Sequence, residues 1–344
     1  MAYASITKPS LHYNTKLYTG NSGSQAITGV GFQPDFTWIK TRTTNNHRLF
    51  DVLRGVNKNI KSNDTQNEIT ATDQLMSFDS DGFTLGADGS VNSNTVASWN
   101  WKGGGSGSAN TDGTINTTVS ANTTSGVSII TYTGTGSAGT IGHGLGVKPA
   151  AWHVKARSET RAWYGWHHSI PLGDKITLNE SGAKTTDTSL FTTTAPTTSV
   201  INLGNSVGVN NSGQTFVCYA FAEKKGYSKM GAFTGNGNAD GTFVYTGFKP
   251  AFLLIKIYSG TGQWTIFDNK RSSSGGGNEI DKILHPNVTN TENTADDVDF
   301  LSNGFKMRNT AANANGNGST YIYMAIAEEP LVANVGASIP ATAR

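Results

Sequence analysis

Residues 231–256 read GAFTGNGNADGTFVYTGFKPAFLLIK, and two earlier stretches of the chain follow the same order. Each stretch opens with an aromatic residue, threonine and glycine, reaches a proline, and closes with a short apolar run ending in lysine. The prolines are Pro34, Pro149 and Pro250, and the lysines are Lys40, Lys155 and Lys256. Both sets are spaced by 115 and then 101 residues (149 − 34 and 250 − 149; 155 − 40 and 256 − 155). This spacing predicts three diverged copies of one unit in series.

Short strands separated by turns are expected within each copy. Residues 217–222 alternate between large side chains (Val217, Tyr219, Phe221) and small ones, which is the period of two of a β-strand. Residues 251–257 are apolar on both faces, as in a central strand covered by two layers. No long stretch has the apolar period of an amphipathic helix. The sequence predicts an all-β protein of three tandem β-sandwich repeats, jelly-roll-like, with short terminal arms.

The domain boundaries follow from the repeats and from the composition between them. Residues 103–128 begin with GGGSGSANTDGTINTT, which predicts a flexible Gly/Ser/Thr-rich linker between the first two copies. Only six residues, 224–229, join the second copy to the third. The expected organisation is an N-terminal arm (1–16), repeat 1 (17–102), the linker (103–128), repeat 2 (129–223), repeat 3 (231–328) and a C-terminal arm (329–344).

Charge and composition exclude several classes of partner. The formal net charge is +2 with scattered lysines and arginines, so no basic stripe for nucleic acid is expected. No apolar run approaches the length that spans a bilayer, and the N-terminus does not read as a secretory signal peptide. The single cysteine, Cys218, lies in an apolar strand and cannot form a disulfide within one chain.

Two short motifs resemble ligand sites but lack the neighbouring residues that such sites require. Residues 134–139 match the glycine spacing of a dinucleotide-binding loop, yet no helix follows to hold a pyrophosphate. Residues 79–82 open like a calcium loop, yet the further carboxylates are absent. Neither a nucleophile with its base nor a pair of carboxylates set in apolar strands is evident. We therefore expect no catalytic residues, no metal and no cofactor.

One aromatic cluster remains as a candidate ligand site. It consists of Trp163, Tyr164, Trp166, His167 and His168, whose aromatic rings could stack on sugar faces. Adjacent histidines alternate sides of a strand, so the two histidines are not expected to chelate one metal. The alternative is that the two tryptophans are core residues, equivalent to Trp264 and Phe267 of the third copy.

The repeated motifs also resemble a known class of protein. YTGN, GFQPDFTWIKTR, LFDVLRG, SFDSDGFTLG and ASWNWK in the first copy, with FLSNGFKMR and YIYMAIAEEP in the third, are similar to repeated units of structural proteins from marine tailed bacteriophages, often labelled tail or fibre proteins. The resemblance covers nearly all of residues 16–330; the second copy departs most, because it lacks the Arg54-Gly55 pair and the Asp-Gly-Phe turn. The resemblance implies a virion component and carries no catalytic residues.

The leading hypothesis is a bacteriophage virion protein, a tail fibre or tail-associated component that binds a host receptor. Loops rich in Gly, Ser, Thr and Asn supply adaptable hydrogen bonding for such a role. A capsid decoration or head fibre protein is the first alternative, and a polysaccharide depolymerase the second. The expected partners are other virion proteins, a host surface glycan or protein, and further copies of this chain, with a trimer as one candidate oligomer. The protein would be made in the host bacterial cytoplasm and reside in the virion.

Overall fold

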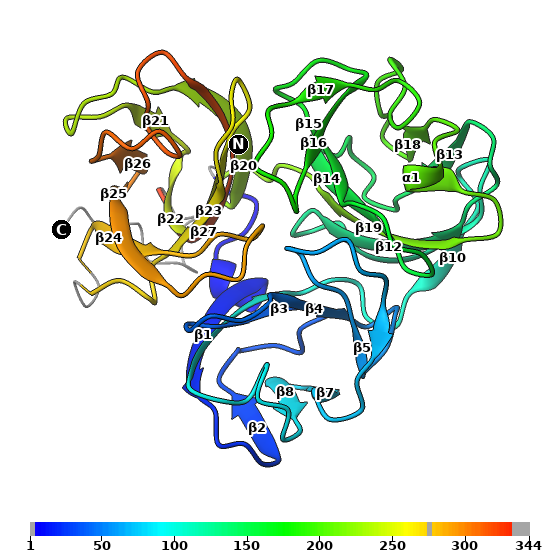
Figure 1. Ribbon diagram of the computed structural model, residues 1–344, viewed down its shortest axis with the longest axis horizontal. Coiled ribbons are helices and arrows are strands. Elements are labelled where there is room, and N and C mark those ends of the chain that lie inside the picture. Colours follow the sequence, from blue (N-terminus) through cyan, green and yellow to red (C-terminus); the bar gives the residue numbers. More distant parts are fainter. Residues whose placement is uncertain (1–3, 274–276, 332–344) are drawn as a thin grey trace.

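The computed structural model describes residues 4–273 and 277–331, and it consists almost entirely of β-strands in three lobes around a common centre (Figure 1). We call the lobes unit 1 (residues 13–101), unit 2 (residues 127–221) and unit 3 (residues 228–330). The all-β prediction is confirmed, since the described residues contain only a 3₁₀ turn, η1 (Pro9–Leu11), and a single helical turn, α1 (Val207–Asn210), besides strands.

The strands have the following bounds. Unit 1 contains β1 (Tyr13–Thr19), β2 (Gln25–Thr28), β3 (Phe36–Thr41), β4 (Arg48–Asp51), β5 (Lys58–Asn59), β6 (Ile69–Thr70), β7 (Leu75–Asp79), β8 (Gly82–Leu85) and β9 (Thr95–Trp101). Before and within unit 2 lie β10 (Ser108–Asn110), β11 (Thr117–Asn122), β12 (Val127–Thr133), β13 (Gly139–Gly142), β14 (Ala151–Ala156), β15 (Tyr164–His167), β16 (Asp174–Thr177), β17 (Thr185–Thr186), β18 (Val200–Leu203) and β19 (Thr215–Phe221). Unit 3 contains β20 (Ser228–Thr234), β21 (Phe243–Tyr245), β22 (Phe248–Ile257), β23 (Trp264–Asp268), β24 (Glu279–Ile283), β25 (Asn293–Leu301), β26 (Gly304–Met307) and β27 (Thr320–Pro330).

One strand order occurs in all three units. The inner sheets run β1-β9-β3-β4, β12-β19-β14-β15 and β20-β27-β22-β23, in each case with the first and last strands of the unit side by side. The outer sheets likewise pair β2 with β8, β13 with β18 and β21 with β26. The strand register shows which residues of the three units are equivalent. Lys40, Lys155 and Lys256 each lie opposite a residue of the last strand of their own unit, namely Ala97, Val217 and Ile322.

The Tyr/Phe-Thr-Gly motif forms a turn that a buried asparagine holds in place. In unit 1 the Asn92 amide nitrogen donates to Gly23 O at 2.6 Å, and its oxygen accepts from Asn21 N at 3.1 Å. In unit 3 Asn315 does the same with Asn238 O (2.9 Å) and Asn236 N (3.1 Å). The asparagines are fully buried, so the bonds replace water for backbone groups that would otherwise be unsatisfied.

The glycine of this motif is required by the close approach of the asparagine's backbone. A Cβ at Gly20 would lie 2.2 Å from the carbonyl carbon of Asn92, and one at Gly235 would lie 2.5 Å from Gly316 O. We expect Gly20→Ala to lower the free energy of unfolding by about 1–3 kcal/mol, because the backbone must shift to make room. Urea denaturation measures this loss. Gly182→Ala is the control, because a Cβ at Gly182 would have no heavy atom within 4 Å. Equal effects of the two substitutions would contradict the proposed cause.

The predicted flexible linker, residues 103–128, is instead ordered. Strand β11 pairs with β12, and β10 pairs with β11, so the segment extends the inner sheet of unit 2. Ile115 and Val119 are 5% and 6% exposed, and these two side chains anchor the segment to the core. The composition was misleading because β-branched threonines favour strands where an open sheet edge is available.

The N-terminal arm is also shorter and better packed than expected. Strand β1 begins at Tyr13, not at residue 17, and Ala4 and Ile6 are 1% and 4% exposed. Ser5 N donates to Lys225 O at 2.9 Å, so this segment lies against the connection between units 2 and 3. Of the expected C-terminal arm, Glu329 and Pro330 belong to β27, and residues 332–344 lie outside the described part of the chain.

Candidate functional site

An equivalent buried lysine lies at the end of the third strand of each inner sheet, and two of these lysines bond to a neighbouring unit. Lys40, Lys155 and Lys256 are all 0% exposed, and burial lowers the pKa of each to about 8. Lys155 Nζ donates to Thr65 O of unit 1 at 3.1 Å, and Lys256 Nζ donates to Ser181 O of unit 2 at 3.0 Å. The lysines of units 2 and 3 therefore each join their unit to the preceding one, whereas Lys40 Nζ donates to Thr41 O and Thr43 O within unit 1.

A second set of equivalent residues closes the three units into a ring. Trp163 Nε1 of unit 2 donates to Lys61 O of unit 1 at 2.7 Å, and Trp264 Nε1 of unit 3 donates to Thr177 O of unit 2 at 3.0 Å. His47 Nε2 of unit 1 lies 3.0 Å from His285 O of unit 3. These contacts run from unit 2 to unit 1, from unit 3 to unit 2 and from unit 1 to unit 3, so the ring has pseudo-threefold symmetry.

Buried ion networks lie at two of the three junctions. Arg54 pairs with Asp51 and Glu68 in unit 1, and Arg271 pairs with Asp268 and Glu292 in unit 3. Each network extends to the last strand of the next unit. Tyr219 Oη donates to Asp51 Oδ2 at 2.7 Å, and Trp99 Nε1 donates to Asp268 Oδ2 at 3.0 Å.

At the third junction a neutral histidine replaces the aspartate. His167 lies opposite Ala151 as Asp51 lies opposite Phe36 and Asp268 opposite Phe252. Its Nε2 lies 3.1 Å from Tyr323 O of unit 3, and its Nδ1 accepts from Ser169 N at 3.1 Å. Burial and the neighbouring His168 lower the pKa of His167 to about 3. His167 therefore joins units 2 and 3 by a neutral hydrogen bond.

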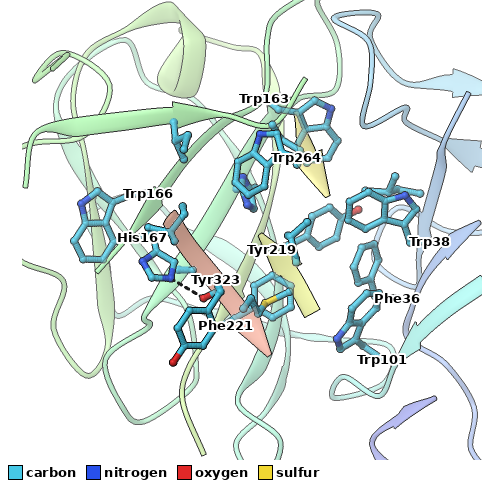
Figure 2. A pocket seen from close by; sticks show the side chains of 18 residues that line it. Phe36, Trp38, Trp101, Trp163, Trp166, His167, Tyr219, Phe221, Trp264 and Tyr323 are labelled. Carbon is cyan, nitrogen blue, oxygen red and sulfur yellow. Dashed lines mark hydrogen bonds between the residues drawn. The ribbon is translucent and has the colours of Figure 1, made fainter. Parts of the chain in front are cut away.

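The centre of the ring holds an apolar cavity of about 40 Å³ to which all three units contribute side chains (Figure 2). Its lining includes Phe36, Trp101, Tyr219, Phe221, Trp264 and Tyr323. The imidazoles among the lining residues are those of His153 and His167. Burial lowers the pKa of His153 to about 4, so both imidazoles are neutral at physiological pH. The cavity belongs to the core that joins the units.

The residues that the sequence proposed as a ligand site are divided between this core and the surface. Trp163, Trp166 and His167 are 0%, 6% and 4% exposed, whereas Tyr164 is half-buried and His168 is exposed. One face of Trp166 stacks on Trp152, with ring centroids 4.6 Å apart. The burial of Trp163 and Trp166 favours the alternative that their equivalence to Trp264 and Phe267 had raised, namely that both are core residues.

A surface groove of about 510 Å³ lies beside the exposed end of this cluster in unit 2. Its lining is mainly apolar, with Lys148, His168 and Glu223 as the polar members. The lining residues are Val147, Lys148, Pro149, Ala150, Trp166, His168, Ile170, Leu172, Ala195, Pro196 and Glu223. Such a surface can hold a ligand that has an apolar face and polar edges.

One substitution within the repeated motif distinguishes this groove. Val147 is 39% exposed, whereas Phe32 and Phe248, which precede the equivalent prolines, are 4% and 0% exposed. In units 1 and 3 a buried phenylalanine thus occupies the position where unit 2 carries a smaller, exposed side chain. This difference is visible in the sequence, because unit 2 has Val-Lys-Pro where units 1 and 3 have Phe-Gln-Pro and Phe-Lys-Pro. It was not predicted to mark a binding site.

Among residues 4–273 and 277–331, no group of three His, Cys, Asp or Glu side chains is placed to hold a metal ion. Within the same residues, none of the helices is long and apolar enough to cross a membrane.

Residues 8–330 match the family model described as a domain of unknown function, DUF7483. The chain belongs to this family. The match runs from η1 to the last residue of β27, so the family model covers the whole three-unit ring. Comparison of this DUF7483 protein with curated proteins and with solved structures gives no significant match.

Proposed function

We propose that this DUF7483 protein is a structural component of a bacteriophage virion, a tail fibre or tail-associated protein that binds a receptor on the host surface. The observation that carries receptor binding is the groove of unit 2, where Val147 replaces the buried phenylalanine of the other units. The resemblance of the repeated motifs to phage structural proteins supports the virion assignment. The ligand class is a host glycan or surface protein with an apolar face.

The three-lobed ring supports the same role. We infer that the three units are diverged copies of one β-sandwich, because one strand order and one set of junction residues recur in each. Divergence after duplication lets one copy acquire a binding surface while the other copies keep the ring closed. Unit 2, which departs most from the shared motifs, is the copy that carries the groove.

Adsorption competition tests this function. Purified protein should block phage adsorption to host cells, and Val147→Asp should weaken the block at least about tenfold by placing a charge in the mainly apolar lining of the groove. Val207→Asp is the matched control, because Val207 is an exposed valine of unit 2 (47%) outside the groove lining. Loss of activity in both variants, or in neither, would contradict receptor binding through the groove.

The pseudo-threefold ring favours a second candidate, a capsid decoration or head fibre protein. Three similar lobes around one axis match the threefold positions of an icosahedral shell, which a single chain could then cover. Protein that binds empty capsids, and neither binds cells nor competes for adsorption, would establish this candidate in place of the first. Shortening of host polysaccharide by the protein would instead indicate a depolymerase.

A further inference from the structure

A lysine and a glutamate that form an ion pair in unit 3 are separated in unit 2. In unit 3, Lys249 Nζ lies 3.1 Å from Glu328 Oε2. Their equivalents in unit 2 are Lys148, which precedes the repeated proline, and Glu223, in Phe-Ala-Glu where unit 3 has Ile-Ala-Glu. Glu223 Oε1 instead accepts from Met230 N at 2.9 Å. Within the described residues Glu223 forms no ion pair with Lys148, so these two charges do not neutralise each other directly.

Both members of this separated pair line the groove of unit 2. Lys148 and Glu223 are exposed there, together with His168. An ammonium group donates hydrogen bonds to acid and hydroxyl oxygens, whereas a carboxylate accepts them from hydroxyl groups. A ligand that satisfies both side chains therefore carries acid groups and hydroxyl groups, besides the apolar face that the rest of the lining requires.

The groove adjoins a second pocket at the connection between units 2 and 3. This junction pocket has a volume of about 380 Å³, and its lining includes Ser228, Lys229, Tyr245 and Thr246. Glu223 lines both the junction pocket and the groove, so the two hollows meet at this side chain. Each has a volume within the range of about 300–1,000 Å³ that holds a drug-sized molecule. Together they form a surface for a chain of sugars rather than for one sugar.

The junction pocket supplies a positive charge and an aromatic ring. Lys229 Nζ donates to Tyr245 O at 2.8 Å and lies 5.4 Å from the centroid of the Tyr245 ring. Both contacts are with neutral groups, so they leave the charge of the ammonium uncompensated. The Tyr245 side chain is 53% exposed, and an exposed ring can pack on the apolar face of a sugar.

The charges of the combined surface favour an anionic ligand. Glu223 is the sole carboxylate among the described residues that line the groove and the junction pocket. Lys148 and Lys229 each carry a positive charge, so positive charge is in excess. Such an excess attracts ligands of the opposite sign.

We propose that this surface binds an acidic polysaccharide, whose acid and hydroxyl groups contact Lys148 and Glu223 in the groove and whose next sugars contact Lys229 and Tyr245 in the junction pocket. The inference rests on the proposed function, because it names the ligand class of the receptor-binding groove. An acidic polysaccharide fits better than an acidic peptide. Sugar hydroxyls can donate to Glu223, whereas the ionised side chains of an acidic peptide only accept.

Titration calorimetry with galacturonate oligomers tests the extended surface. A hexamer should bind at least about tenfold more tightly than a dimer, because it occupies the groove and the junction pocket together. Lys229→Gln should remove this difference, and Lys229→Arg, which keeps the charge, should retain it. Lys58→Gln is the matched control, since Lys58 Nζ donates to a neutral oxygen, Thr70 Oγ1, at 2.7 Å and lies outside both linings. A hexamer no tighter than the dimer, or a gain that survives Lys229→Gln, would overturn the proposal.

Two further probes test the ligand class. Neutral maltohexaose and hexaglutamate should each bind at least about tenfold more weakly than the galacturonate hexamer, because the first lacks acid groups and the second lacks hydroxyl groups. Equal binding of hexaglutamate would assign the surface to an acidic peptide, and equal binding of maltohexaose would show that charge does not select the ligand. Either result would overturn the proposal.

The failure of this inference is distinguishable from the failure of the proposed function. If no galacturonate oligomer binds while Val147→Asp still weakens the block of adsorption, the acidic polysaccharide is wrong and receptor binding through the groove stands. If Val147→Asp and its control Val207→Asp leave the block of adsorption equally strong, receptor binding through the groove is wrong as well.

Discussion

Arg271→Ala should lower the free energy of unfolding by about 3–5 kcal/mol, because it leaves a buried carboxylate without its partner. Arg271 and Asp268 are both completely buried, and Arg271 also donates to Ile266 O at 2.9 Å and to Glu292 at 3.1 Å. Asp268 is the acceptor for Trp99 of unit 1, so the substitution weakens the junction between units 3 and 1 as well. Urea or thermal unfolding measures the loss.

Arg308→Ala is the matched control for this prediction. Arg308 is also paired with two aspartates, Asp240 and Asp299, but its side chain is 43% exposed. An exposed pair contributes about 0–1 kcal/mol, so this variant should remain close to the wild type. The double variant Asp268→Leu, Arg271→Met removes both charges and should be less destabilised than Arg271→Ala. Equal losses for Arg271→Ala and Arg308→Ala would show that the buried network is not the cause.

The sequence predicted the local features of the fold because these depend on short-range patterns. The period of two around Tyr219 identified a strand, and the recurrence of Pro34 and Lys40 at fixed spacing identified equivalent strands. The role of Lys155 in joining two units was not predictable, because its acceptor, Thr65 O, is 90 residues away in another unit. Strand order and ring closure escaped prediction for the same reason.

The candidate site was harder to predict than the fold. The sequence left two interpretations of Trp163 and Trp166, a binding surface or the core, and favoured the core; their surroundings in the neighbouring units decide between these roles. Trp163 is covered because its indole nitrogen bonds to Lys61 of unit 1, a contact that no pattern within unit 2 reveals. The groove was missed because it is marked by a smaller residue, Val147, and sequence reasoning about binding sites looks for distinctive side chains.

Mild acid should destabilise the ring through the histidines at its centre. His153 and His167 have pKa values lowered from 6.5 to about 4 and about 3, chiefly because the protein around each ring disfavours its charged form. The unfolded chain therefore binds protons below pH 6.5 that the folded protein does not bind until the pH is much lower, and stability must fall over that interval. Between pH 7.5 and pH 5 each histidine should lower the free energy of unfolding by about 2 kcal/mol, or about 4 kcal/mol together.

Urea unfolding at pH 7.5 and at pH 5 measures this loss, and the pH window separates it from the carboxylates. The pKa of Asp281, for example, is lowered to about 2, so its contribution is retained at pH 5 and disappears only in stronger acid. Burial also lowers the pKa of His47 and of His143, so these rings act in the same direction and part of the pH dependence should persist without His153 and His167.

The double variant His153→Leu, His167→Gln should lose less stability between the two pH values than the wild type. An unchanged difference would mean that the rings around the central cavity are not the groups that resist protonation. Because His167 occupies the position of Asp51 and Asp268 and bonds to Tyr323 O of unit 3, the acid-sensitive junction should be the one between units 2 and 3.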